Sequence, residues 1–380
     1  MLKSFKTEIN PTKEQIVLIN KTIGVCRFIY NFYIAHNQEL YKTNHSFMSG
    51  REFSVWMNNE YLPDNPEYSW IKEVSSKSVK QSIMNGYEAF SKFFQGKSRF
   101  PRFKKKHQDL VKMYFVKTNP TDCYCERHRI KIPTLGWVRL KEKGYIPLTK
   151  NDYVIRSGTI SKQAGRYYVS AIVEIPDKIV NEYSEGIGID LGIKDLAIIS
   201  TGQSFKNINK SSNVRKLEKR LKREQRRLSR KQIKKKGEVA QNREKQRLKV
   251  QKLHQRISNI RTDYINKTIV EIVKTKPSYI TIEDLNVKGM MKNKHLSKAV
   301  SSQRFYEFRT KLKSKCDEYR IELRIADRFY PSSKTCNSCG RINKTLKLSD
   351  RIFKCECGYI ADRDFNASLN LKDLKIYTVA

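Results

Sequence analysis

Two tight pairs of cysteines lie near the C-terminus, Cys336 with Cys339 and Cys355 with Cys357, and 15 residues separate them. Four thiolates in this arrangement suit a soft, tetrahedral ion such as Zn²⁺, because each short pair supplies two corners of the tetrahedron. The second pair is Cys-x-Cys, which is tighter than Cys-x-x-Cys but supplies the same ligands. Four sulfurs leave no open coordination position, so the pattern predicts one structural Zn²⁺, with iron in the same cage as the alternative.

Acidic residues mark three distant points of the chain. Two apolar runs end in acids, at Asp190 and Glu283, and a predicted helix begins with Asp364 just behind the cysteines. Three carboxylates that converge repel one another, and hard Mg²⁺ or Mn²⁺ ions relieve that repulsion. Two such ions can activate water and stabilise the departing 3′-oxygen of a phosphodiester. An acid at a strand end is also commonly a cap or a surface ion pair, so spacing alone leaves that alternative open.

The composition indicates a polyanionic partner. Lys and Arg number 77 against 38 Asp and Glu, a formal charge of +39 over 380 residues. Nucleic acid is the natural counterpart of such an excess. Ribosomal and chromatin proteins share this composition, so charge identifies a class of partner and no reaction.

The sequence has no long uncharged apolar run, and residues 1–6 lack the apolar core of a signal peptide. We therefore expect a cytoplasmic protein. The other four cysteines have no framework spacing and are expected to be buried or incidental thiols, although the Cys123 and Cys125 pair leaves a second metal site open. These four are Cys26, Cys123, Cys125 and Cys316.

The first part of the chain predicts helices followed by short strands. Thr12 and Gln15 form a capping box that opens a helix to about residue 33, and apolar spacing predicts a second helix over 76–94. Basic and aromatic residues alternate over 99–106, which suits either a nucleic-acid contact or a solvated loop. Glycine-punctuated runs then indicate a small β-barrel or sandwich. These runs cover residues 127–132, 137–141, 153–160 and 167–175.

The later part predicts an interrupted α/β unit. Between residues 210 and 261 there are 21 Lys and Arg against four Glu, a net of +17. Two apolar seams and a break at 234–237 predict an antiparallel helical hairpin, and its one-signed charge favours a phosphate backbone over a purely solvated coiled coil. The remaining predicted elements are strands at 186–192, 195–200, 279–284 and 321–326, and helices at 303–319 and 362–374.

At the acidic segments the chain resembles the TnpB family of RNA-guided DNA nucleases from bacterial insertion sequences, and more distantly the compact type V CRISPR effectors. Residues 188–192, Gly-Ile-Asp-Leu-Gly, match the first acidic motif of the family's RuvC-like domain, which has an RNase H fold. Residues 282–286 look like the second and residues 362–367 like the third. In the third motif the acid before x-Asn-Ala is catalytic, so Asp364 is preferred and Asp362 is a candidate helix cap.

The resemblance runs nearly end to end and is most specific from residue 186 onward. It implies a multidomain α+β and α/β protein in which residues 1–10 and 97–180 form a wedge-like β-barrel, with residues 11–96 inserted as a helical recognition unit. Residues 181–380 would then form an RNase H-like (RuvC) nuclease domain. Insertions into that domain would be the basic helical hairpin at about 210–268 and a zinc ribbon at about 331–360.

The activity implied by the resemblance is hydrolysis of DNA at guide-complementary sites beside a short target-adjacent motif. Asp190, Glu283 and Asp364 would hold two Mg²⁺ or Mn²⁺ ions. The partners would be a guide RNA derived from the transposon end and double-stranded target DNA, with base pairing choosing the sequence. Guidance by RNA is implied by the resemblance alone, because the composition indicates only binding to a polyanion.

Basic side chains in the helical unit, the 99–106 run and the hairpin are the candidate nucleic-acid contacts. Lys77 and Gln81 would read the target-adjacent motif, and His254 is expected at the surface or against RNA rather than as a general base. The candidates are Lys77, Gln81, Arg102, Lys104, Lys105, Arg223, Arg227, Arg230, Arg243, Arg247 and Arg256.

Three other functions remain open on sequence. A nuclease-inactive descendant would act as an RNA-guided repressor, although the three intact acids argue against it. A strand-joining transposase would yield joined products instead of plain breaks. A compact CRISPR effector would be distinguished by a repeat array in the neighbouring DNA.

Overall fold

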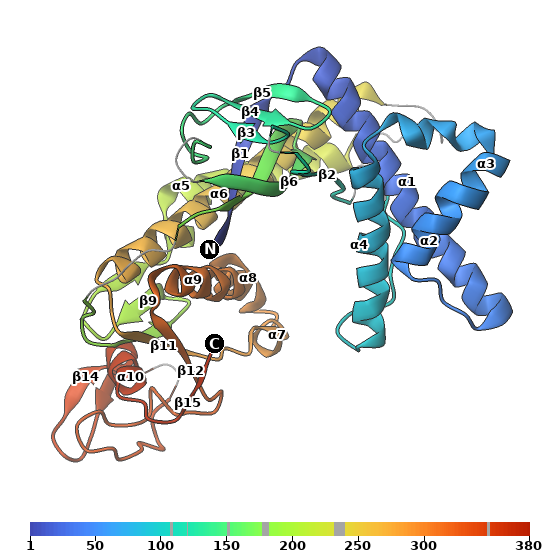
Figure 1. Ribbon diagram of the computed structural model, residues 1–380. Coiled ribbons are helices and arrows are strands. Elements are labelled where there is room, and N and C mark those ends of the chain that lie inside the picture. The colour runs from blue at the N-terminus through green and yellow to red at the C-terminus, as the bar shows by residue number, and fades with distance from the viewer. Residues whose placement is uncertain (107–108, 120, 150–152, 177–181, 232–239, 348–349) are drawn as a thin grey trace. The chain divides into compact units, whose positions relative to one another are not determined.

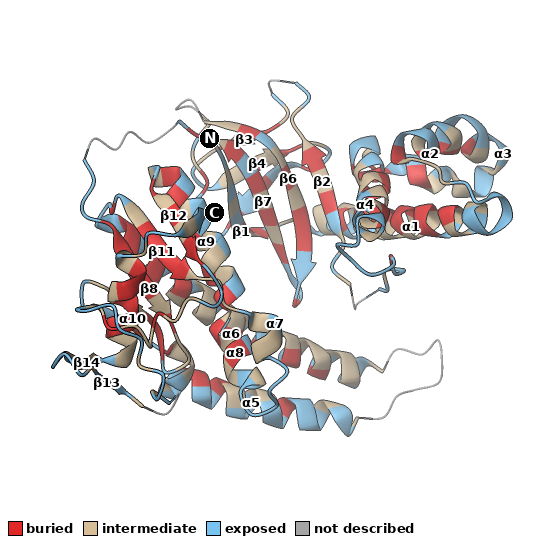
Figure 2. Cartoon of the chain, turned by 90° about the horizontal axis from the view of Figure 1, so that it is seen from below, coloured by how far each residue is buried: buried red, intermediate tan, exposed pale blue. Residues whose placement is uncertain are grey.

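The computed structural model describes residues 1–106, 109–119, 121–149, 153–176, 182–231, 240–347 and 350–380. The chain divides into two compact units, Met1–Pro176 and Asp177–Ala380 (Figure 1). Buried residues run along the strands of the large sheet in each unit (Figure 2). None of the described helices combines the length and the apolar character needed to cross a bilayer.

Along the chain, a helical bundle is inserted between the first two strands of the first unit, β1 and β2. Helix α1 (Lys13–Asn44) starts at the predicted Thr12 and Gln15 capping box, and α4 (Ser76–Phe94) has the predicted bounds. Helix α1 continues past the predicted end near residue 33 and stops where His45 turns left-handed. The helices share one aromatic-rich core. Between α1 and α4 lie α2 (Gly50–Trp56), η1 (Met57–Tyr61), α3 (Leu62–Asp64) and η2 (Pro66–Glu73).

The predicted β-barrel of the first unit is wrong, because its strands form an open sheet. The seven strands pair antiparallel in the order β2-β6-β7-β1-β5-β4-β3, so β2 and β3 are edges. Strand β3, at one edge, has only two residues. At the other edge α1 and α4 contact β2, in the place where a closed barrel would need a further strand. The strands are β1 (Leu2–Asn10), β2 (Lys112–Val116), β3 (Tyr124–Cys125), β4 (Arg129–Ile132), β5 (Gly136–Leu140), β6 (Val154–Gln163) and β7 (Arg166–Glu174).

The second unit is built on a six-stranded mixed sheet in the order β10-β9-β8-β11-β12-β15. Strands β8, β11 and β12 run parallel, so their carboxyl ends meet at one edge. The strands are β8 (Ile187–Leu191), β9 (Asp195–Ile199), β10 (Ser204–Lys206), β11 (Tyr279–Glu283), β12 (Glu322–Ala326) and β15 (Tyr377–Val379). The other elements include η3 (Ile208–Lys210), α7 (Val287–Met290), α8 (Ser297–Gln303), α9 (Phe305–Tyr319), β13 (Ile352–Lys354), β14 (Ile360–Asp362) and α10 (Arg363–Lys372).

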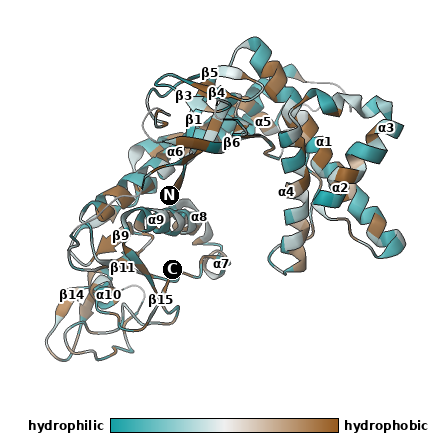
Figure 3. Cartoon of the chain, in the orientation of Figure 1, coloured by the Kyte–Doolittle hydropathy of each residue, from teal (hydrophilic) through white to brown (hydrophobic). Residues whose placement is uncertain are grey.

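The basic segment forms the predicted antiparallel helical hairpin, from α5 (Ser212–Ser229) and α6 (Gln241–Lys274). Its apolar seam includes Leu217 and Ile257, and hydrophobic residues recur along the mostly hydrophilic α6 (Figure 3). A buried polar pair crosses the seam, where the Gln246 side chain donates to Glu224 Oε2 at 2.8 Å. The predicted break at 234–237 lies outside the described residues.

One glycine lets α10 approach β8 at backbone distance. A Cβ on Gly188 would lie 2.0 Å from the carbonyl oxygen of Ser368 and 2.4 Å from the amide nitrogen of Lys372. Rigid backbone cannot give way as a flexible side chain can. Gly188→Ala is therefore expected to cost about 3 kcal/mol of unfolding free energy, near the upper end for overpacking, which calorimetry would detect as a fall in melting temperature of several degrees.

The matched control is Gly24→Ala in α1, where an added Cβ meets nothing within 4 Å. A glycine inside a helix is less stable than alanine by about 0.5–1 kcal/mol, so this substitution should be neutral or stabilising. Equal destabilisation by both substitutions would contradict the packing argument.

Candidate active site and thiolate cluster

The three predicted acids come together at the carboxyl edge of the second sheet. Asp190 is on β8 and Glu283 ends β11, and the pairing of Ile189 with Ile282 sets the two acids at neighbouring positions. Asp364 lies in the first turn of α10, which packs on β8.

The site is electrostatically strained without a cation. Burial, together with repulsion from Glu283 and Asp364, raises the pKa of Asp190 well above its ordinary value. Burial also raises the pKa of Glu283, with a further rise from Asp364 and an opposing effect of a hydrogen bond from Ser332. Carboxyls held together in this way favour either a shared proton or a bound cation.

Arginines form ion pairs with two acids beside Asp190 and Glu283, namely Asp364 and Asp284. The guanidinium of Arg363 lies 2.7 Å from Asp364 Oδ1, and Arg351 Nη1 lies 3.8 Å from Asp364 Oδ2. Asp284, which follows Glu283, pairs with Arg328 and, at 2.7 Å, with Arg309. The hydrogen bond from Arg328 and then that from Arg309 lower the pKa of Asp284. Asp284 therefore holds two arginines through ion pairs and has a lowered pKa, whereas the pKa of the neighbouring Glu283 is raised.

The predicted helix cap at Asp362 is confirmed. Its Oδ1 accepts from the backbone N–H groups of Asp364 at 3.0 Å and Phe365 at 3.1 Å, which satisfies two free donors at the start of α10. Asp364 is thereby held in the first helical turn.

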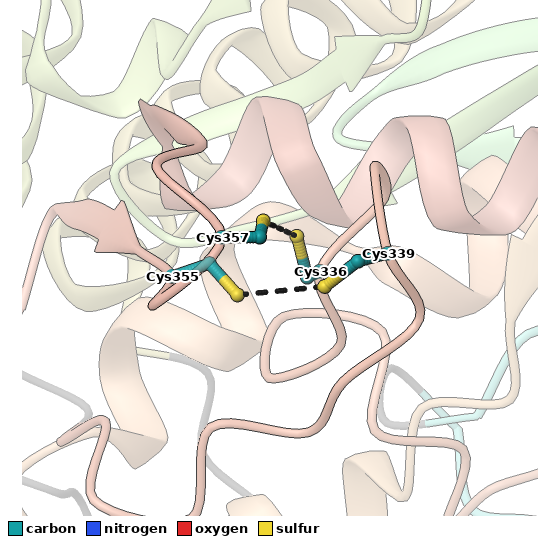
Figure 4. Close-up of side chains that lie close together, drawn as sticks. All are labelled: Cys336, Cys339, Cys355 and Cys357. Atoms are coloured by element: carbon teal, nitrogen blue, oxygen red, sulfur yellow. Dashed lines mark hydrogen bonds between the residues drawn. The ribbon is translucent and has the colours of Figure 1, made fainter.

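The four predicted cysteines form a compact cluster of thiols (Figure 4). The Sγ atoms of Cys336 and Cys357 lie 3.7 Å apart, and those of Cys339 and Cys355 lie 3.6 Å apart. A metal–sulfur distance of about 2.3 Å places the sulfurs of a tetrahedron about 3.8 Å apart, so the spacing fits a tetrahedral ion.

Two thiols of the cluster have pKa values shifted in opposite directions. The backbone N–H of Arg341 and hydrogen bonds from neighbouring thiols lower the pKa of Cys339 to about 7. The backbone N–H of Tyr359 lowers the pKa of Cys357, but hydrogen bonding to Cys355 and Cys339 outweighs it and raises that pKa to about 12. Cys339 therefore ionises more readily than Cys357, whose thiolate a bound cation would stabilise.

The remaining cysteines are buried thiols, as expected. Burial raises the pKa of Cys123 to about 11 and the pKa values of Cys125 and Cys316 to about 12. Cys26 is likewise buried, and its pKa is raised. None of the four belongs to a ligand cluster among the described residues.

The carboxylates are spaced more widely than the thiols. Among the described residues, only the four cysteines form a group of possible metal ligands whose donor atoms all lie within 4.8 Å of one another. The three carboxylates therefore do not form a cage for a single ion in this structure.

The candidate nucleic-acid contacts differ in how far they are exposed. Lys104 is partly buried, with its ammonium 4.2 Å from the centre of the Tyr30 ring, and its pKa is lowered by burial. Gln81, Arg243 and Arg247 are also partly buried, and Gln81 donates to Asn85 at 3.1 Å. His254 is at the surface, beside Gln225. The exposed candidates are Lys77, Arg102, Lys105, Arg223, Arg227, Arg230 and Arg256.

Sequence reasoning missed the polar residues that connect the acids to the cysteines. Ser332 donates to Glu283, and the side chains of Asn366 and Asn370 on α10 donate to the segment just before Cys336. Two asparagines four residues apart, on the same face of the predicted helix, were the available signal, because buried amides need fixed partners.

Comparisons with known proteins agree with this architecture. Residues 170–294 match a family model described as "Probable transposase", residues 305–371 one described as "Cas12f1-like, TNB domain", and residues 1–46 one described as "Helix-turn-helix domain". In this chain the last of these segments folds as β1 and the single helix α1.

Similar proteins span nearly the whole chain. "Putative RNA-guided DNA endonuclease" of Streptomyces pristinaespiralis is 31% identical over 97% of this chain and 88% of that protein. "Putative RNA-guided DNA endonuclease InsQ" of Escherichia coli (strain K12) is 30% identical over 97% of this chain and 91% of that protein. A solved structure, "Cryo-EM structure of the Cas12f1-sgRNA-target DNA complex", has a TM-score of 0.59 at 17% identity, covering 95% of this chain and 83% of that one.

The chain has a mixed α/β multidomain fold that is similar to that of the Cas12f1 structure. Within that class, the chain belongs to the TnpB family.

Proposed function

We propose that this protein is an RNA-guided DNA endonuclease of an insertion sequence, which hydrolyses DNA phosphodiesters at guide-complementary sites. The observation that carries the proposal is the placement of Asp190 beside Glu283 by the β8–β11 register and near Asp364 on α10, which packs on β8. The three carboxylates would bind cations, and the net charge of +39 would attract a polyanion such as nucleic acid. The names of the two relatives supply the other parts of the proposal, which are that RNA is the guide and that DNA is the substrate.

Asp190, Glu283 and Asp364 would hold two Mg²⁺ or Mn²⁺ ions, which would supply activated water and charge stabilisation at the leaving oxygen. The donor set fits hard cations, since all three side chains are carboxylates and two have raised pKa values. Arg363, which lies against Asp364, would compensate the charge of that carboxylate when no ion is bound. Cys336, Cys339, Cys355 and Cys357 would hold one structural Zn²⁺.

The domain roles follow from the same proposal. The six-stranded sheet and α10 would form the RuvC-like nuclease domain, residues 181–380, with α5 and α6 as its basic insertion. The open sheet and its helical bundle would serve as the wedge and recognition parts, residues 1–10 with 97–180 and residues 11–96. The exposed arginines of α5 and α6 would contact phosphates, because neutralising phosphate releases counterions.

The proposal predicts a discrete copurifying RNA and guide-directed cutting. The RNA bound to the purified full chain should be one species that ends in sequence flanking the transposon. With that RNA and Mg²⁺, the protein should cut DNA that matches the guide and leave a mismatched duplex intact. The readouts are sequencing of the bound RNA and electrophoresis of the DNA products. Bulk ribosomal RNA, or joined strands in place of breaks, would contradict the proposal.

A further inference from the structure

The loop of residues 327–335, here called the connecting loop, joins β12 to the cysteine cluster and touches the candidate active site. Its Ser332 is only 4% exposed, and the Ser332 hydroxyl donates a hydrogen bond to Oε1 of Glu283. A buried hydroxyl with a single carboxylate partner fixes how that carboxylate is turned.

Helix α10 holds the connecting loop in place. The Asn370 side chain donates to the carbonyl oxygens of Ser332 and Thr335, at 2.7 Å each, and Asn366 donates to the Thr335 carbonyl at 2.7 Å. Both asparagines are almost fully buried, at 0% exposure for Asn366 and 4% for Asn370. Because α10 also carries Asp364, one helix sets the positions of Asp364 and of the loop that reaches Glu283.

The other end of the connecting loop is held by charge. Arg328 pairs with Asp284, the residue that directly follows Glu283 on the chain. The backbone N–H of Phe329 donates to Asp327 Oδ1 at 2.8 Å, which closes the turn before Ser332. Ser332 is therefore fixed from both sides before any ion binds.

From this geometry we propose that Ser332 is a positioning residue, which orients the Glu283 carboxylate so that it can share cations with Asp190 and Asp364. The inference rests on the proposed function and deepens it. With Oε1 of Glu283 held by the hydroxyl, the carboxylate keeps one orientation and Oε2 keeps its lone pairs for an ion. Without the hydroxyl, repulsion from the neighbouring carboxyls favours rotation of Glu283 away from them.

The test is Ser332→Ala in the full chain, with Mn²⁺ as the probe. Residues that orient metal ligands typically contribute 10–100-fold to metal affinity, so Mn²⁺ should bind the variant about 10–100-fold more weakly, as measured by paramagnetic resonance without nucleic acid. Cleavage should fall at limiting Mn²⁺ and recover at saturating Mn²⁺, because the ligands themselves remain. Zinc content should match that of the wild type, and the melting temperature should fall no further than in a control that also loses one buried serine hydrogen bond.

The control is Ser368→Ala on α10, which also removes a buried serine hydroxyl, one that donates at 2.7 Å to the Phe365 carbonyl within the helix. It should leave Mn²⁺ affinity unchanged. Unchanged affinity in Ser332→Ala, an equal loss in the control, or a loss that accompanies lower zinc content or a larger fall in melting temperature than the control shows would each overturn the proposal. A wild-type protein that binds Mn²⁺ tightly and cuts no guided DNA would count against the proposed function alone.

Discussion

Replacing Asp190 by asparagine is expected to abolish DNA cleavage while stabilising the ion-free protein. The substitution keeps the shape of the side chain and removes the charge at the centre of the acidic cluster. Metal ions contribute several kcal/mol to a phosphodiester transition state, so loss of their shared ligand should reduce the cleavage rate at least about a thousandfold. Gel assays with guide RNA and Mg²⁺ would measure the first effect, and calorimetry the second.

The stabilising effect should depend on pH with a definite sign. The pKa of Asp190 is higher in the folded protein than in the unfolded chain. The protonated Asp190 side chain therefore contributes its full stabilisation below the unfolded pKa, at about pH 4. That stabilisation is lost as the pH rises through the pKa of the folded protein. Asparagine has no proton to lose. The Asp190→Asn variant should therefore match the wild type near pH 4 and exceed it increasingly at higher pH.

Mg²⁺ supplies the internal control for this variant. Added Mg²⁺ should raise the melting temperature of the wild type, because an ion that binds only the folded state stabilises it, and should leave Asp190→Asn unchanged. RNA binding should be retained, since the basic hairpin is untouched. A variant that still cuts, or that melts below the wild type at pH 8, would contradict the role assigned to Asp190.

Short-range patterns in the sequence predicted elements in both units. The capping box at Thr12, the apolar seams of α5 and α6 and the acid-ended strands each depend on neighbours within a few residues. Helix α1 was predicted too short because its last turns bury little apolar surface. That end is fixed instead by Asn37, whose side chain accepts from the Met48 backbone N–H at 2.8 Å across a turn.

Long-range pairing explains what the sequence did not predict. Whether the first sheet closes depends on how its two edges, β2 and β3, are covered, and strand periodicity is the same in an open sheet and a barrel. Likewise, the contact of Ser332 with Glu283 joins residues 49 apart, and no local pattern specifies it. The cysteines could be identified from their spacing and the acids from strand ends together with the family resemblance, whereas the residues that orient them could not.

Replacing Cys339 by serine is expected to empty the thiolate cluster and slow cleavage about a hundredfold while leaving RNA binding intact. The segment around the cysteines contains the short β13–β14 ladder. In the described part of residues 336–362, Phe353 is the one large side chain that is fully buried, at 0% exposure. So small a core cannot hold its fold, and metal binding must supply the folding free energy. Metal analysis should find one zinc per chain in the wild type and none in the variant.

The loss of activity follows from the attachment of this segment to the acids. Once the cluster unfolds, the connecting loop and the start of α10 lose one fixed end, and a displacement of about 1 Å at a reacting group can cost about a hundredfold in rate. The control is Cys123→Ser, which removes a buried thiol from the first unit and should leave zinc content unchanged. If zinc-free Cys339→Ser protein cut guided DNA at the wild-type rate, the acids would be positioned by the sheet and α10 alone, and the cysteine cluster would need another role.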